Sequence, residues 1–67
     1  MNLNDKKDFL IEASDYIYSL VNGIKQSGIM LTREELREWI IKEEKDYNNH
    51  FEDFQREWII EAVFEEL

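Results

Sequence analysis

The strongest local signal for the fold is the segment Leu31-Thr32-Arg33-Glu34-Glu35-Leu36. Thr32 and Glu35 have the spacing of a capping box, in which each side chain accepts a hydrogen bond from the other residue's backbone N–H at the start of a helix. Leu31 and Leu36 flank them at the spacing of a hydrophobic staple. We therefore expect a helix over about 33–47, ended by the two asparagines that follow.

The residues before this segment predict a long amphipathic helix over about 4–26, which we expect to be the central one. Apolar residues recur at helical spacing between Phe9 and Ile24. The opposite face carries four acids: Asp5, Asp8, Glu12 and Asp15. The helix should end at Gly28, because glycine readily adopts the left-handed backbone of a helix end. Asn22-Gly23 is the competing end.

The residues after it predict a third helix over about 50–66, with Asn49 as its N-cap. One apolar face carries Phe51, Phe54, Trp58, Ile59 and Ala62, and a second apolar face carries Ile60, Val63, Phe64 and Leu67. At about 100° per residue the two faces point in nearly opposite directions. One small core does not readily bury both, so we expect the second apolar face to be exposed.

The predicted fold is an all-α, single-domain three-helix protein that spans 1–67. A chain of 67 residues buries only about 60% of its unfolded surface, so a monomer is marginally stable and a dimer is an alternative. Because the chain has no Cys, disulfides cannot supply the missing stability. The predicted core consists of Phe9, Leu10, Ala13, Ile17, Leu20, Leu36, Trp39, Ile40, Phe54 and Trp58.

The charge of the chain is strongly acidic and uneven. Its 8 basic and 16 acidic residues give a net charge of −8, most of which lies in residues 46–67. Such a surface repels nucleic acid and acidic lipid headgroups, so we expect a basic protein as the partner. No apolar run approaches the length of about 18 residues that a membrane span needs. The N-terminal residues lack a signal-peptide layout, so the expected location is the cytoplasm.

Four acids of the third predicted helix, Asp53, Glu57, Glu61 and Glu65, follow one another at steps of four residues and form an acidic ladder. Like charges at this spacing destabilise a helix slightly, and Arg56 is the only base among residues 46–67. Each step is about 6 Å along the helix axis, comparable to the spacing of phosphates on a nucleic-acid strand. We therefore place the partner-binding surface on this ladder and the second apolar face beside it.

No residue pattern predicts catalysis or metal binding. Asp46, Asn48 and Glu57 match ligand positions of a calcium-binding loop, but Phe51 stands where that loop needs a glycine for its sharp turn. His50 is the only histidine and should lie on the surface, in the first turn of the third helix. A helical body of this size has little room for a substrate cleft. We expect no enzyme activity, no metal and no cofactor.

These features predict a non-catalytic, acidic helical inhibitor or adaptor that docks on a basic protein. In its sharpest form the acidic ladder mimics nucleic acid and blocks a nucleic-acid-binding enzyme. In composition the chain is similar to the small acidic, Cys-poor proteins of phages and mobile elements that counter restriction or CRISPR systems, although it matches no family motif. The alternative is a homo-oligomeric regulatory or assembly subunit whose surplus apolar surface pairs with itself.

Overall fold

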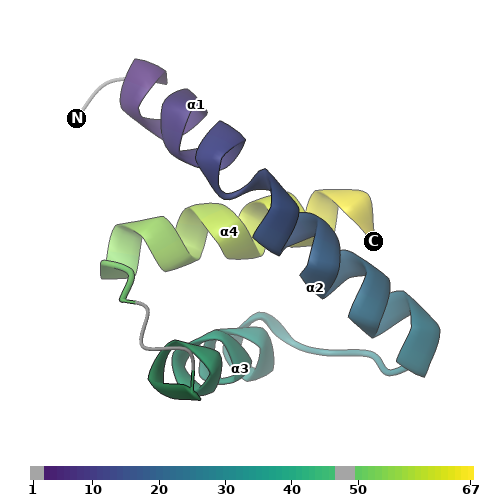
Figure 1. Cartoon of the computed structure of the whole chain (residues 1–67). Coiled ribbons are helices and arrows are strands. Elements are labelled where there is room, and N and C mark those ends of the chain that lie inside the picture. The colour runs from purple at the N-terminus through teal and green to yellow at the C-terminus, as the bar shows by residue number, and fades with distance from the viewer. Residues whose placement is uncertain (1–2, 47–49) are drawn as a thin grey trace.

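The computed structural model describes residues 3–46 and 50–67. They form four helices: α1 (Leu3–Glu12), α2 (Ser14–Ser27), α3 (Arg33–Asp46) and α4 (Asp53–Glu66) (Figure 1). The described residues contain no strand, so the all-α prediction is confirmed, whereas the expected number of three helices is wrong. The predicted first helix is divided into α1 and α2. The predicted second helix corresponds to α3, and the third begins at Asp53 instead of His50.

The division between α1 and α2 lies at Ala13, whose backbone angles are φ −90° and ψ 5°. Two hydrogen bonds still span this point, from the N–H of Ala13 to the carbonyl of Phe9 and from the N–H of Ile17 to the carbonyl of Ala13. Figure 1 shows α1 and α2 following one another with an offset here. Alanine is the best helix former, so tertiary packing causes the break: the offset lets both helices contact α4.

The end of α2 agrees with the prediction at Gly28. Gly28 has a φ of 69°, and its N–H donates to the carbonyl of Ile24. This left-handed conformation is strained for residues with a Cβ atom. The competing end at Asn22-Gly23 is wrong, because α2 continues to Ser27, whose hydroxyl donates to the carbonyl of Gly23 at 2.9 Å.

The start of α3 is the predicted capping box. The N–H of Thr32 donates to Glu35 Oε1 at 2.9 Å, and the N–H of Glu35 donates to Thr32 Oγ1 at 3.1 Å. Leu36 is fully buried, and Leu31 packs half-buried against the same core. The local signal therefore places both the first turn of α3 and the side that faces the core.

The start of α4 differs from the prediction. Asn49, the expected N-cap, lies outside the described residues, and Glu52 occupies the N-cap position, where its N–H donates to Gln55 Oε1 at 2.8 Å. The N–H of Phe51 donates to a carboxylate oxygen of Glu44 in α3 at 2.7 Å. This long-range hydrogen bond holds the chain before α4 against α3, so the helix begins only after it.

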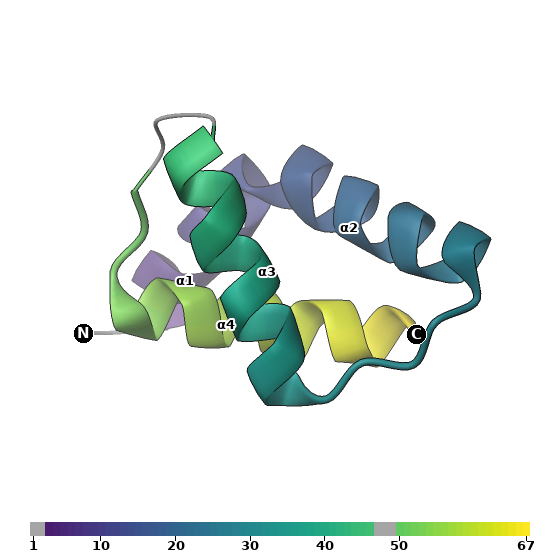
Figure 2. The ribbon, with the colours of Figure 1, turned by 90° about the horizontal axis from the view of Figure 1, so that it is seen from below.

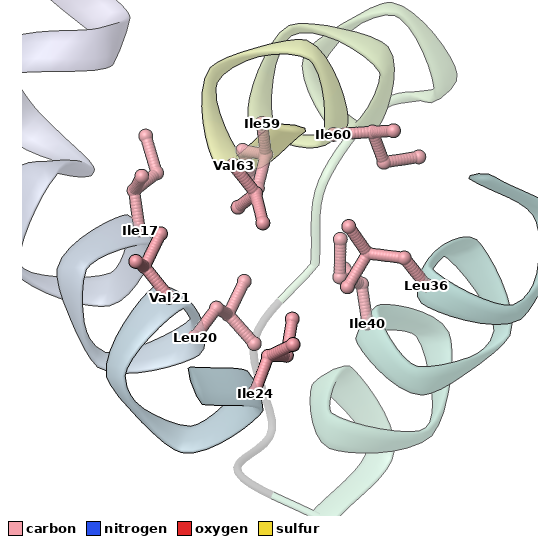
Figure 3. Close-up of a cluster of buried hydrophobic side chains, with 9 residues drawn as sticks. All are labelled: Ile17, Leu20, Val21, Ile24, Leu36, Ile40, Ile59, Ile60 and Val63. Atoms are coloured by element: carbon pink, nitrogen blue, oxygen red, sulfur yellow. The ribbon is translucent and has the colours of Figure 1, made fainter. Parts of the chain in front are cut away.

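The central helix is α4, not the predicted first helix, because α4 contacts α1, α2 and α3. Figure 2 shows α3 crossing α4 when the molecule is seen from below. Apolar side chains of α2, α3 and α4 converge between these helices (Figure 3). The buried core consists of Ile17, Leu20, Val21, Ile24, Leu36, Ile40, Ile59, Ile60 and Val63.

Both apolar faces of α4 contribute to this core, because a central helix is covered on more than one side. Ile59 belongs to the first face, and Ile60 and Val63 belong to the second; all three are fully buried. The expectation that the second apolar face is exposed is therefore wrong for Ile60 and Val63. In return, Phe54 of the first face is 40% exposed and Trp58 is half-buried.

The predicted core is confirmed in its centre and wrong at one edge. Four predicted residues are buried: Ile17, Leu20, Leu36 and Ile40. Four more pack half-buried around them: Phe9, Leu10, Ala13 and Trp39. Trp58 instead packs against Phe9 and Phe54, with ring centroids 5.8 and 5.0 Å away. The prediction omitted Ile60 and Val63 because it assigned only the first apolar face of α4 to the core, and it also omitted Ile59 of that first face.

Substitution by alanine should have opposite effects on stability at Gly23, inside α2, and at Gly28, at its end. A Cβ atom at Gly23 meets nothing within 4 Å, so Gly23→Ala should raise the free energy of unfolding by about 0.5–1 kcal/mol. Gly28→Ala should lower it by about 1 kcal/mol, because alanine is strained at positive φ. Urea denaturation measures both. Equal effects of the two changes would show that α2 does not end at Gly28.

The packing of α4 can be tested with one residue from each apolar face. Ile60→Ala removes a fully buried side chain and should lower the free energy of unfolding by about 2–5 kcal/mol. Phe54→Ala removes a more exposed ring that packs edge-on against Trp58 and should cost about 1 kcal/mol. Thermal melting compares the variants. A larger loss for Phe54→Ala would mean that α4 presents its other face to the core.

Candidate binding surface

Three members of the acidic ladder are paired with cations of the same chain. The pairs are Asp53 with Arg56 Nη1 at 2.6 Å, Glu57 with Arg37 of α3, and Glu61 with Lys6 Nζ of α1 at 3.3 Å. Arg56 supplies the pair within α4, and the other two cations come from helices distant in sequence, which spacing along the third predicted helix could not indicate. Through Glu57 and Glu61, the acidic ladder connects α4 to α3 and α1.

The accessible part of the ladder is at its ends. The carboxylate of Asp53 remains 90% exposed beside Arg56, and Glu65 is exposed. Between them, the pairs of Glu57 and Glu61 are partly exposed, and such pairs contribute about 0–1 kcal/mol to stability. Of the four ladder members, Asp53 and Glu65 are therefore the most accessible that are not tied to another helix by the pairs described above.

The second apolar face has also lost most of its accessible area. Ile60 and Val63 are in the core. The ring of Phe64 is half-buried, and the guanidinium carbon of Arg33 lies 5.7 Å from its centroid. Leu67 is 47% exposed. A partner could therefore reach only Phe64 and Leu67 of the four predicted apolar contacts.

A buried ion pair between α3 and α4 was not predicted. Glu44 is 6% exposed and Arg56 is 9% exposed. Arg56 donates from Nε to Glu44 Oε2 at 2.7 Å and from Nη2 to Glu44 Oε1 at 3.0 Å, so the contact is bidentate. Glu44 Oε1 also accepts the N–H of Phe51. Every hydrogen-bonding atom of this pair that is buried has a partner, which is the condition under which a buried charge is tolerated.

The electrostatics of the pair follow from these contacts. The hydrogen bonds from Arg56 hold the pKa of Glu44 below its ordinary value of 4.5; burial opposes this shift, and the N–H of Phe51 reinforces it. The same hydrogen bonds raise the pKa of Arg56 above its ordinary value. One feature of the sequence could have indicated the pair: Arg56 is the only base in residues 46–67. The spacing of the acidic residues in the sequence does not indicate that Glu44 is the partner of Arg56.

A cleft opens where α1 and α2 meet the residues before α4. It has a volume of about 290 Å³ and is lined by Phe9, Glu12, Ala13, Tyr16, His50 and Phe51. The ring of Phe51 packs edge-on against Phe9, with centroids 6.0 Å apart, and lies tilted by 33° against the ring of Tyr16, with centroids 5.8 Å apart. We call this hollow the aromatic cleft. The aromatic cleft could not be predicted from the sequence, because its walls come from three separate segments.

Carboxylates surround the aromatic cleft. Glu12 lines it and is exposed. The hydroxyl of Tyr16 donates to Glu43 Oε1 at 2.7 Å. The two ring nitrogens of His50 each lie 3.8 Å from a carboxylate oxygen, Nδ1 from Glu44 and Nε2 from Glu52. The cleft therefore combines an apolar aromatic wall with a negative surrounding.

The cleft adjoins a second acidic surface, which we call the N-terminal acidic face. Its members are the four exposed acids of α1 and α2: Asp5, Asp8, Glu12 and Asp15. The first three share one side of α1 by helical spacing, and Asp15 follows in the first turn of α2 after the break at Ala13. Glu12 belongs both to this face and to the cleft, so the two features form one continuous surface.

The described residues offer little for metal chemistry. No group of three or more His, Asp or Glu side chains in residues 3–46 and 50–67 could hold a metal ion. Of the calcium-loop residues considered above, Asn48 lies outside the described part and Glu57 pairs with Arg37. His50 is exposed, as predicted, but precedes α4 instead of lying in its first turn.

Each helix in the described part of the chain is too short or too polar to span a bilayer. No protein-family model, curated protein or solved structure matches this chain. The functional inference therefore rests on the N-terminal acidic face, the acidic ladder and the aromatic cleft.

The buried ion pair predicts a specific pH dependence. Because folding lowers the pKa of Glu44, its stabilising effect is present above about pH 4.5 and is lost as the pH falls through the lower folded-state pKa. Glu44→Gln should abolish this part of the pH dependence. At neutral pH it should cost about 3 kcal/mol, because Arg56 stays buried without the bidentate carboxylate of Glu44 and keeps only the exposed Asp53 as a charge partner.

Urea unfolding between pH 7 and pH 3 tests this prediction. Glu57→Gln is the matched control, because it removes the same charge from a partly exposed pair with Arg37 and should cost less than about 1 kcal/mol. If Glu44→Gln loses stability on acidification as steeply as the unaltered chain, Glu44 does not carry the predicted linkage.

Proposed function

We propose that this protein is a non-catalytic binding module whose acidic surface docks on a basic protein. The observation that carries the proposal is the unequal exposure of its charges. Every acidic side chain is exposed except Glu43, Glu44 and Glu57. Four of the eight bases are engaged within the chain: Lys6, Arg37 and Arg56 in ion pairs and Arg33 over an aromatic ring. The outward surface is thus dominated by carboxylates.

The proposed docking surface combines the N-terminal acidic face with the accessible ends of the acidic ladder, Asp53 and Glu65, and the apolar contacts Phe64 and Leu67. A surface of this sign attracts a basic partner and speeds its association. It repels nucleic acid and acidic membranes. The sharpest form of the proposal is an inhibitor that occupies the basic groove of a nucleic-acid-binding enzyme in the cytoplasm.

A second candidate function is self-association as a homo-oligomeric subunit. Ile11 of α1 and Tyr18 of α2 are 62% and 69% exposed. Ile11 also lines a shallow hollow with Lys7, Leu10 and Ser14. Exposed apolar side chains of this size favour burial in an interface. In this case Ile11→Asp should turn a dimer into a monomer in analytical ultracentrifugation, while charge-neutral variants of the acids leave assembly unchanged.

To test the proposed function, basic proteins are captured on the immobilised chain and eluted with increasing salt. A captured protein is then purified, and its association rate with the chain is measured. A variant with Asp8→Asn, Glu12→Gln and Asp15→Asn should lower the association rate by about tenfold or more and flatten its salt dependence. The matched control is Glu34→Gln, Glu38→Gln and Glu66→Gln, which removes three exposed charges elsewhere. An affinity that does not depend on salt concentration would contradict docking through charge. So would binding that is abolished by Ile11→Asp but not by the charge-neutral variants.

A further inference from the structure

The aromatic cleft has a shape and chemistry that simple attraction between opposite charges does not require. Its apolar wall is formed by Phe9, Tyr16 and Phe51, whose rings are in contact. A neutral apolar ligand would satisfy these rings but would bring no charge partner to Glu12, the carboxylate that lines the cleft. An anion would be repelled by Glu12. A ligand that suits both the rings and the carboxylates must be cationic and able to contact an aromatic surface.

Arginine has these properties more fully than lysine does. Its guanidinium group is planar and weakly hydrated, stacks on aromatic rings and forms bidentate hydrogen bonds with carboxylates. Lysine carries a compact, strongly hydrated charge that loses more on entering an aromatic hollow. The cleft volume of about 290 Å³ is at the lower limit for small-molecule sites, which favours a single side chain as its occupant.

The chain already uses both of these arginine contacts internally. The guanidinium of Arg33 lies over the ring of Phe64. That of Arg56 binds Glu44 in a bidentate arrangement. Glu44 in turn holds the N–H of Phe51, so the buried pair positions one ring of the cleft.

We propose that the aromatic cleft receives an arginine side chain of the basic partner. The guanidinium stacks against the rings of Tyr16 and Phe51 and forms a charge-assisted hydrogen bond with Glu12. This inference rests on the proposed function and deepens it: the N-terminal acidic face attracts the partner, and the cleft selects arginine over lysine at one position.

Two blocked heptapeptides of equal charge provide the probe, one with lysine at every basic position and one with arginine in place of the central lysine. Titrations followed by chemical-shift changes should show that the arginine peptide binds about fivefold or more tightly. The shifts should concentrate on the ring signals of Phe9, Tyr16 and Phe51.

Matched variants separate the cleft from the general charge. Glu12→Gln and Tyr16→Leu should each remove most of the preference for arginine. Asp15→Asn and Tyr18→Leu make the same changes at exposed positions that do not line the cleft, so they should retain it. Circular dichroism checks that each variant is folded; if Tyr16→Leu unfolds, the comparison of Glu12→Gln with Asp15→Asn decides alone.

The outcomes distinguish this inference from the proposed function. Equal affinity of the two peptides, or equal effects of Glu12→Gln and Asp15→Asn on the preference, would overturn arginine selection while leaving charge-driven docking intact. If neither peptide binds but a basic protein is still captured in a salt-dependent manner, the cleft proposal is wrong and the docking surface lies elsewhere. If no basic protein is captured, the proposed function fails as well.

Discussion

The bidentate ion pair between Glu44 and Arg56 connects the end of α3 to the start of α4 and fixes how these two helices meet. Both side chains are nearly inaccessible to water, so each charge depends on the other to offset its desolvation. The same carboxylate also accepts the N–H of Phe51, which places that ring against Phe9 and Tyr16. One interaction thus connects the packing of two helices with the wall of the aromatic cleft.

The use of the few basic residues explains how a chain of net charge −8 can fold compactly and still present an acidic exterior. Pairs between helices neutralise carboxylates that α4 would otherwise bring close to one another. These two cations are partly exposed and already paired, so they add little positive charge to the outer surface. In the proposed function, the N-terminal acidic face would therefore engage a partner largely apart from the pairs that join α4 to α1 and α3.

Local features of the fold could be predicted because they depend on neighbouring residues only. The reciprocal hydrogen bonds of Thr32 and Glu35 and the left-handed end at Gly28 need no contact with the rest of the chain. Helix periodicity likewise identified the inward side of the segment that contains Ile17 and Leu20. For the candidate site, the sequence indicated the exposed acids of α1 as one face, since their spacing alone places them together.

The sequence by itself determined the all-helical class, the N-terminal cap of the second predicted helix and the acidic character of the surface, because propensity, spacing and net charge do not depend on contacts between distant segments. The tertiary structure alone decided that α4 is central and buries Ile59 and Ile60 on both of its faces. It also decided the break at Ala13, the partners of the acidic ladder and the aromatic cleft. The physical reason is common to these features: each depends on which distant helix covers a given side chain, and desolvation by a distant neighbour leaves no trace in local periodicity.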